Sequence, residues 1–248
     1  MSIVNMLVER QGISFSKRFC ARKAGVTGKE SIKDIFNEWA RGSTASLMDW
    51  GHPLFHKWWL KELDLAEDSK VLDVGCGTGW ASRIVARIVP NGEVVGIDLA
   101  EGMVEKARQL TSKGKAHDSG NLSFNIADVE NIPYPDGHFD CIICVESFSW
   151  YPNPGIALRE MKRVLKAGGK LYVADVADGR LVRLMLRVWK RFMPGLDKWN
   201  IYSENEFKDF LEAEFTGVYQ KKANPIYGLS GERVLLTVGT KNGVSRNA

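Results

Sequence analysis

A glycine-rich run follows a short apolar stretch in this chain: Val71-Leu72-Asp73-Val74-Gly75-Cys76-Gly77-Thr78-Gly79. A backbone without side chains can approach a nucleotide-like ligand closely. Nineteen residues beyond Gly79, a second apolar run ends in Asp98. Its carboxylate can accept hydrogen bonds from two ribose hydroxyls. The glycine run and the acid together predict a site for a nucleotide-type cofactor.

A dinucleotide site of the G-x-G-x-x-G type is the first alternative. Its third glycine or alanine lets the helix pack closely on the strand, and Trp80 at that position would block the approach. Asp73, two residues before the first glycine, has no role in the dinucleotide pattern. The residues therefore disfavour an NAD site.

Asp73, the glycine run and Asp98 together resemble motif I and the following acidic strand end of class I S-adenosylmethionine-dependent methyltransferases. Residues 127–140 look like the exit of the third strand and the turn into the fourth in that family. Residues 158–173 resemble its helix, glycine turn and fifth strand. The matches follow the family's order and are most similar to its small-molecule branch, which includes the quinone, sterol and tocopherol C-methyltransferases.

The resemblance implies S-adenosyl-L-methionine as methyl donor and S-adenosyl-L-homocysteine as product. In this family the acid at Asp128 faces the adenine amino group, from which a carboxylate can accept a hydrogen bond. Asp73 is expected to act indirectly, on loop amides or through water. The implied cofactor contacts are Asp73, Gly75, Cys76, Gly77, Gly79, Asp98, Leu99, Asp128, Val129 and Val145.

Each of these features also has a structural interpretation. Asp98 could cap the helix expected near Glu101, and Asp128 could be a turn acid. The glycines could form only a tight turn, although three within five residues carry a large entropic cost for that purpose. We therefore expect a ligand at the glycine run and keep both interpretations of the two acids open.

Strand-like apolar runs alternate with helix-length amphipathic segments, which is typical of a parallel sheet covered on both faces. Strands are predicted at 70–74, 93–97, 121–126, 139–145, 169–175, 214–222 and 232–240, and helices at 79–89, 101–111 and 154–166. The resemblance implies a Rossmann-like, doubly wound α/β sheet of seven strands, the last antiparallel. An N-terminal helical cap and a lid helix after strand five are expected in addition.

The predicted organisation has three parts. Residues 1–60 form an N-terminal arm and helical cap, and residues 61–240 form the methyltransferase domain with a lid insertion at about 177–206. Residues 241–248 are polar and small, which predicts a flexible tail. The acceptor side is expected in the less family-like segments, because binding specificity is usually built from loops and caps.

Glu146, Tyr151 and His52 are the candidates for orienting a nucleophile or accepting its proton. A base is optional, because alignment of the reactants and exclusion of water can supply most of the acceleration of methyl transfer. The catalytic residue therefore stays unassigned. The aromatic segment 36–60 either closes over the cofactor or packs against the sheet.

Residues Arg180–Met193 predict a strongly basic amphipathic helix. Its basic face is either solvated or contacts an anionic membrane surface, in which case a lipophilic acceptor could enter beside it. The primary hypothesis is methyl transfer to a small, lipophilic acceptor. RNA or protein methylation is one alternative, and a noncatalytic S-adenosylmethionine-binding regulator or partner subunit is the other.

Composition adds little to these hypotheses. The net charge of +4 neither requires nor excludes an anionic partner, and motifs typical of nucleic-acid amino or cytosine C5 methylation are absent, which disfavours a nucleic-acid acceptor. Cys141 and Cys144 are three apart in a predicted strand and should point to opposite faces, so no metal site is predicted. Four cysteines and no apolar run of about 20 residues favour a cytoplasmic protein, with peripheral membrane contact as a hypothesis. The oligomeric state stays open.

Overall fold

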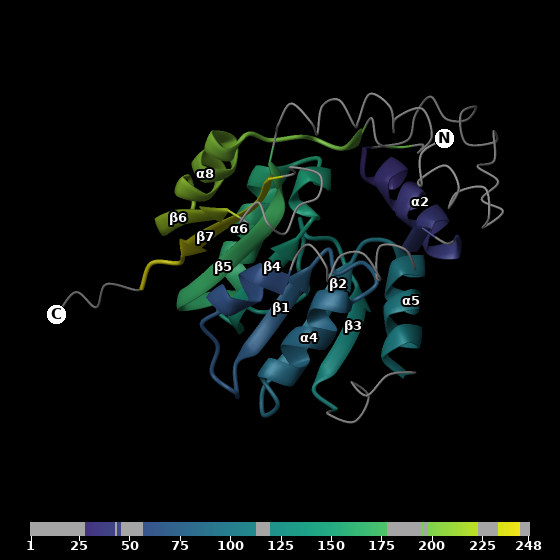
Figure 1. Ribbon diagram of the computed structural model, residues 1–248, viewed down its shortest axis with the longest axis horizontal. Coiled ribbons are helices and arrows are strands. Elements are labelled where there is room, and N and C mark those ends of the chain that lie inside the picture. The colour runs from purple at the N-terminus through teal and green to yellow at the C-terminus, as the bar shows by residue number, and fades with distance from the viewer. Residues whose placement is uncertain are drawn as a thin grey trace.

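One mixed sheet organises the protein (Figure 1). The computed structural model describes residues 28–42, 44–45, 57–112, 120–177, 195, 198–222 and 233–243. Seven strands lie in the order β3-β2-β1-β4-β5-β7-β6. They are β1 (Lys70–Val74), β2 (Glu93–Asp98), β3 (Leu122–Ile126), β4 (Phe139–Val145), β5 (Leu165–Ala177), β6 (Thr216–Lys222) and β7 (Arg233–Thr240).

The pairing pattern is that of a doubly wound sheet with one reversed strand. The strands β1 to β5 pair in parallel, whereas β7 runs antiparallel to both β5 and β6. The predicted Rossmann-like fold with an antiparallel last strand is therefore confirmed. In such a sheet the ligand site lies at the carboxyl ends of the parallel strands, where the strand order reverses between β1 and β4.

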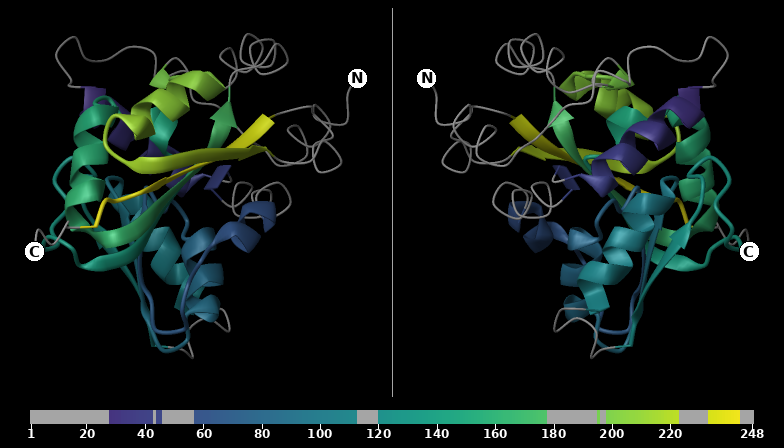
Figure 2. Two further views of the ribbon diagram at one scale, coloured as in Figure 1. Left: turned by 90° about the vertical axis from the view of Figure 1, so that its left-hand side faces the viewer. Right: turned by 90° about the vertical axis from the view of Figure 1, so that its right-hand side faces the viewer.

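Helices cover both faces of the sheet (Figure 2). On one face, α4 and the short η2 join an apolar cluster with β1 and β4, and α5 packs beside them against β3. On the other face, α6 and α8 bury apolar side chains against the same strands. These elements, with α2 and η4, are α2 (Gly28–Arg41), η2 (Lys57–Glu62), α4 (Trp80–Ile88), α5 (Glu101–Ser112), η4 (Phe148–Trp150), α6 (Pro154–Val164) and α8 (Glu204–Glu212).

The strand pleat separates the two cysteines of β4 as predicted. Cys141 belongs to the cluster under α4, and Cys144 belongs to the cluster under α6. Both are buried free thiols, and burial raises the pKa of Cys144 to about 12. They are core residues on opposite faces of the sheet, as alternation along a strand requires.

The junction between α6 and β5 differs from the prediction. The helix expected to reach residue 166 ends at Val164, and Leu165 is already extended and pairs with Phe139 in β4. Gly168 and Gly169, expected as the turn that closes the helix, instead lie within β5 and exchange backbone hydrogen bonds with Lys241. Pairing with neighbouring strands decided this boundary, and the helical pattern alone could not show it.

The helix α8 was not predicted, because its sequence begins inside the segment assigned to the lid. Its start carries a capping box, in which the Ser203 hydroxyl accepts from the Glu206 amide and the Glu206 carboxylate accepts from the Ser203 amide. This pattern was readable in the sequence. Phe207 and Leu211 anchor the helix in the core.

Other expectations fall on residues outside the described ranges. These are the arm before Gly28, His52, the basic helix Arg180–Met193 and most of the tail, of which only residues 241–243 are described. Where the chain is described, no helix is long and apolar enough to cross a membrane.

Replacing Ser203 with alanine tests the capping box. The Ser203→Ala variant should lose about 1 kcal/mol of unfolding free energy, the usual cost of losing a serine N-cap. Urea denaturation measures the difference. The control is Ser112→Ala at an exposed position in the last turn of α5, expected to change stability by less than about 0.5 kcal/mol. Equal losses in the two variants would contradict the assigned cap.

Candidate functional site

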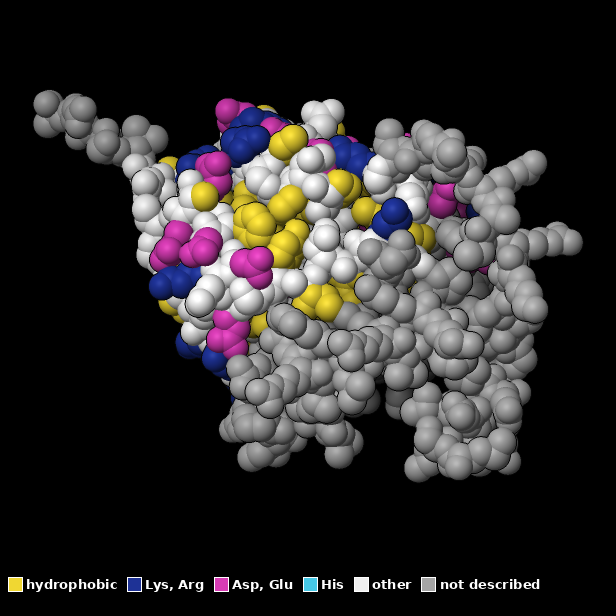
Figure 3. Space-filling model, turned by 90° about the horizontal axis from the view of Figure 1, so that it is seen from above, with side chains coloured by type: hydrophobic (Ala, Val, Ile, Leu, Met, Phe, Trp, Pro, Cys, Tyr) yellow, Lys and Arg dark blue, Asp and Glu magenta, His cyan; other side chains and the backbone are white. Residues whose placement is uncertain are grey.

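A pocket opens at the carboxyl ends of β1, β2 and β4 and has α2 as a further wall. Its volume is about 970 Å³ when the solvent-open mouth is included. Seen from above, the described surface at this end of the sheet shows a central group of apolar side chains with charged side chains around it (Figure 3).

The glycine loop forms the floor of the pocket. Gly75, Gly77 and Gly79 all have positive φ, at 67°, 53° and 77°. A Cβ on Gly75 would lie 2.4 Å from the Cβ of Ser147, and a Cβ on Gly79 would lie 2.5 Å from the Phe124 ring. At Gly77 no atom lies within 4 Å of that position. The first and third glycines therefore permit packing, whereas Gly77 presents open backbone to the pocket.

Ser147 and Tyr151 support the loop from behind. The Ser147 hydroxyl donates to the Val74 carbonyl at 2.8 Å and lies 2.9 Å from the Tyr151 hydroxyl. Tyr151 also donates to the Val74 carbonyl at 3.4 Å, and the Cys144 thiol contacts both hydroxyls. Burial raises the pKa of Tyr151 well above its usual range. This geometry favours a positioning role for Tyr151 over the proton transfer considered from the sequence.

Asp98 joins the loop to the end of β2. One carboxylate oxygen accepts from the Gly77 amide at 2.9 Å, and the other accepts from the Ala100 amide at 2.9 Å, just before α5 begins. Burial raises its pKa. The structural interpretation of this acid is therefore observed, and the carboxylate also lines the pocket where a ribose hydroxyl could reach it.

Asp73 lies behind the glycine loop and does not line the pocket. It is 1% exposed, and its carboxylate accepts from the Ser82 hydroxyl of α4 at 2.5 Å. Burial raises the pKa of Asp73 to about 7, against the hydrogen bond from Ser82, which lowers it. This placement agrees with the indirect role expected from the sequence.

Asp128 follows β3 and forms an ion pair with α2. The Lys29 ammonium lies 2.7 Å from the Asp128 carboxylate and 2.6 Å from that of Glu130. Asp128 also makes a turn, since its other carboxylate oxygen accepts from the Glu130 amide at 2.9 Å. No sequence signal marked Lys29 or Glu130 as pocket residues, because 99 positions separate Lys29 from Asp128.

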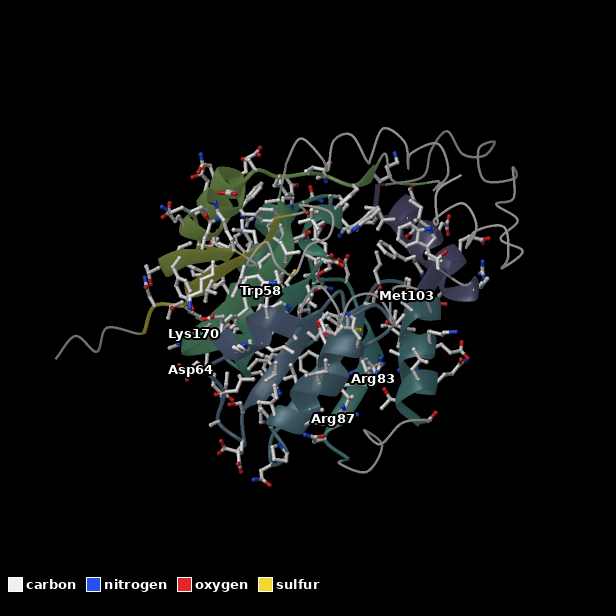
Figure 4. The ribbon with its side chains drawn as sticks, viewed as in Figure 1. Trp58, Asp64, Arg83, Arg87, Met103 and Lys170 are labelled. Carbon is white, nitrogen blue, oxygen red and sulfur yellow. The ribbon has the colours of Figure 1, made fainter. Side chains whose placement is uncertain are left out.

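Further polar contacts hold α2 against α5. Lys33 pairs with Glu101 at 3.0 Å, and the Asn37 side-chain oxygen accepts from the Gly102 amide at 2.8 Å. Met103, near the start of α5, lines the pocket below α2 (Figure 4). This helix closes one side of the pocket, so the predicted N-terminal cap contributes to the site.

An aromatic group forms the far wall. Phe36 and Trp150 line the pocket with ring centroids 5.0 Å apart, Trp39 packs edge-on to both, and Trp199 stacks on Trp150 at an interplanar angle of 10°. By contrast, Trp59 is buried beneath α4 on a sheet face. The two interpretations of the aromatic segment 36–60 thus apply to different residues of it.

The structure brings most of the predicted site residues to one pocket. The predicted cofactor contacts that line it are Gly75, Cys76, Gly77, Asp98, Leu99, Asp128, Val129 and Val145. Among the acceptor-side candidates Glu146 and Tyr151 also line it, whereas His52 lies outside the described residues. Within the described ranges, no three side chains of metal-ligating type gather together.

Residues 72–173 match the family model described as "Methyltransferase domain". This domain is that of a class I S-adenosylmethionine-dependent methyltransferase. The chain is 39% identical over 126 residues to the ubiquinone/menaquinone biosynthesis C-methyltransferase UbiE of Pseudomonas paraeruginosa, covering 50% of this chain and 48% of that protein. The chain thus spans about half the length of the curated relatives it matches.

Solved structures agree on the fold. A SAM-dependent methyltransferase from Aquifex aeolicus is 26% identical with a TM-score of 0.61, covering 79% of this chain and 96% of that one. A methyltransferase of Haloferax volcanii, solved in complex with the Trm112 methyltransferase activator, is 24% identical with a TM-score of 0.70, covering 84% of this chain and 97% of that one.

The cofactor of this family is S-adenosylmethionine, and the residues present fit it. Gly77 offers open backbone, and the carboxylates of Asp98 and Asp128 line the same pocket as acceptors for ribose hydroxyls and for an amine. Asp98 accepts from the Gly77 and Ala100 amides, which hold its carboxylate at the wall of the pocket.

A pair of glycine variants tests the floor of the pocket. Gly77 and Gly120 both have positive φ with no atom near the position that a Cβ would take, but only Gly77 lies in the pocket. Gly77→Ala and Gly120→Ala should each lose about 1–2 kcal/mol of unfolding free energy from the left-handed backbone. Calorimetry should show that only Gly77→Ala weakens S-adenosylmethionine binding, by roughly tenfold or more. Equal affinities in the two variants would contradict this placement.

The pKa of Asp73 predicts a pH-dependent stability. Because the folded-state pKa is raised from 3.8 to about 7, the contribution of Asp73 is present below the unfolded pKa and is lost as the pH rises through about 7. The unfolding free energy of the unmodified protein should therefore fall more steeply between about pH 4 and pH 7 than that of Asp73→Asn. Urea titrations at each pH measure this. An unchanged slope in Asp73→Asn would be the contrary result, and Asp209→Asn at an exposed position of α8 is the control.

Proposed function

We propose that this protein transfers a methyl group from S-adenosylmethionine to a small, apolar acceptor. Its main support is that one pocket is lined both by polar groups and by aromatic rings. The glycine loop, Asp98 and Asp128 provide the polar groups, here called the cofactor end, and Phe36 and Trp150 provide the aromatic surface, here called the aromatic end. The likeness to a C-methyltransferase of ubiquinone/menaquinone biosynthesis supports an acceptor of this kind.

The cofactor end holds and orients the methyl donor. Asp98 is fixed by the Gly77 and Ala100 amides, so its remaining lone pairs have a set direction for ribose hydroxyls. Asp128 is held by Lys29 and by its own turn, and we assign its carboxylate to the adenine amine. Fixed acceptors of this kind lose little conformational freedom when they bind a ligand.

The aromatic end aligns the acceptor and excludes water. When bound, S-adenosylmethionine supplies a methyl group already activated on a sulfonium. The remaining requirement is alignment of the acceptor atom with that methyl group, which intramolecular positioning supplies effectively. Phe36 and Trp150 provide flat apolar surface for a planar acceptor, and the edge-on Trp39 and the stacked Trp199 hold the Trp150 ring in place.

We also propose a cytoplasmic location, and membrane contact through Arg180–Met193, a segment outside the described residues. The alternatives to a small acceptor are RNA or protein as acceptor, a role as partner subunit, and noncatalytic cofactor binding. One structural neighbour was solved with a methyltransferase activator, so assays should be run with cell extract as well as with the purified protein.

Methyl-labelled S-adenosylmethionine tests the proposal directly. The protein is incubated with the labelled cofactor and a cell extract, and the label is followed into organic solvent, nucleic acid, protein and small polar molecules. We expect label in the organic phase. Label in nucleic acid or protein would replace the proposed acceptor, and confirmed cofactor binding without any transfer would favour the noncatalytic alternative.

Two tryptophan variants test the aromatic end. Trp150→Leu removes a pocket wall, whereas Trp39→Leu changes the same aromatic group behind that wall. We expect Trp150→Leu to keep S-adenosylmethionine affinity within about threefold and to lose at least about tenfold in organic-phase transfer. Trp39→Leu should lose clearly less transfer. Equal transfer by Trp150→Leu and the unmodified protein would overturn the acceptor placement, and thermal unfolding checks that both variants are folded.

A further inference from the structure

Two acidic residues follow each other across the carboxyl ends of neighbouring strands. Val145, the last residue of β4, pairs with Ala174 in β5, and the Glu146 amide donates to the Ala174 carbonyl at 2.8 Å. Glu146 therefore follows β4 directly beside Asp175 of β5. Glu146 lines the pocket, and it lies on the same segment as Trp150 of the aromatic end.

Asp175 is an acid inside the core. It is 2% exposed, and its carboxylate accepts from the Ser149 amide at 3.1 Å and from the Val176 amide at 2.8 Å. No Lys or Arg within the described ranges forms an ion pair with it. Burial raises the pKa of Asp175 to about 7, and the charge of Glu146 raises it further.

Two further titratable groups among the described residues interact electrostatically with Asp175, and neither carries a positive charge. The Cys144 thiol comes from β4, and the Tyr202 phenol comes from the chain before α8. Among the described residues, Asp175 therefore faces neutral groups and the carboxylate of Glu146. Two carboxylates placed this way do not both ionise readily, because each charge disfavours the other.

Glu146 is held in a strained conformation. It is the only non-glycine residue of the described ranges with a positive φ, at 50°. This backbone region is unfavourable for a residue with a side chain, because the Cβ comes too close to the following carbonyl oxygen. Such strain persists where the surrounding structure imposes it, and it is concentrated at functional sites. Here the hydrogen bond to Ala174 holds the turn and the residue lines the pocket.

The other acids of the pocket belong to its cofactor end. Asp98 accepts from the Gly77 amide of the glycine loop, and Asp128 and Glu130 hold Lys29. The Tyr151 phenol is bound to Ser147 and to the Val74 carbonyl. Glu146 lines the pocket on the segment that also carries Trp150.

We propose that Glu146 and Asp175 form a carboxylate pair that shares one proton, and that Glu146 accepts the proton released by the methylated acceptor. This inference rests on the proposed function and narrows the acceptor to an apolar molecule with an acidic C–H or O–H. Asp175 does not touch the acceptor and acts as a positioning residue, because it sets how readily Glu146 takes a proton.

The proposed step moves one methyl group to the acceptor and one proton away from it. An electron pair of the acceptor carbon or oxygen forms the bond to the methyl carbon, and the methyl–sulfur bond breaks with its electron pair going to sulfur. The acceptor's proton moves to the Glu146 carboxylate. Glu146 then loses this proton to solvent through the pocket mouth, so the pair returns to its starting charge.

Glu146→Gln tests the proton acceptor. We expect unchanged S-adenosylmethionine affinity and a loss of organic-phase methyl transfer of about 100-fold or more, in the range found for general bases. Glu105→Gln, at an exposed position of α5, is the matched control. Transfer by Glu146→Gln within about threefold of the unmodified protein would overturn the proposal.

Asp175→Asn tests the shared proton through the pH profile of transfer. In the unmodified protein the rate should rise as the pH passes through about 7, when the second proton leaves the pair. In Asp175→Asn the remaining carboxylate is always Glu146, so the rate should reach its plateau at lower pH. A purely structural Asp175 would lower the rate without moving the profile, and superimposed profiles would overturn the proposal.

Infrared titration tests for the shared proton without an activity assay. The protonated-carboxyl band that disappears near neutral pH should shrink in Asp175→Asn. In Glu146→Gln the band should disappear at lower pH. The second variant keeps the test valid if Asp175→Asn does not fold. Asp73 contributes a separate part of that band, which Asp73→Asn removes. An unchanged band in Glu146→Gln would overturn the shared proton. If the band behaves as expected but the protein methylates nothing, the proposed function fails and the pair stands.

Discussion

The hydrogen bond from the Gly77 amide to the Asp98 carboxylate is the interaction on which the rest of the site depends. It joins the loop after β1 to the end of β2, so the two strand ends form one surface. Ser147 and Tyr151 bond the Val74 carbonyl from the opposite side of the loop. The left-handed backbone of the glycines is thus fixed between two sets of partners, and Gly77 can present its backbone to a ligand at little entropic cost.

The acids at this end of the sheet differ in their hydrogen-bond and ion-pair partners. At the cofactor end, Asp98 accepts from the Gly77 and Ala100 amides, and Asp128 pairs with Lys29. Asp73 and Asp175 are buried without a described cation, and burial raises the pKa of each to about 7. Burial favours the protonated state of these carboxyl groups. The environment of each acid, and not its residue type, therefore decides how readily it holds a proton.

The helix α2 completes the pocket through long-range contacts. Lys29, Lys33 and Asn37 bind the turn after β3 and the start of α5. The same helix brings Phe36 to the pocket and Trp39 behind it. One N-terminal element therefore contributes both a charged and an aromatic side chain, Lys29 and Phe36, to the lining of the pocket.

The sheet, the glycine loop and the acids at the ends of β2 and β3 were predictable from the sequence, because they depend on local patterns of apolar periodicity, glycine spacing and strand-end acids. Contacts between residues far apart in the sequence could not be predicted from those patterns. The pairing of Leu165 with Phe139 ended α6 early, Lys29 reached Asp128 across 99 positions, and strand register put Glu146 beside Asp175. Gly79 and Asp73 do not line the pocket, although the sequence predicted both as cofactor contacts. Gly79 packs against Phe124 and Asp73 bonds Ser82, and both partners come from other elements. Contacts between distant segments, and the desolvation they impose, have no signature in the local sequence.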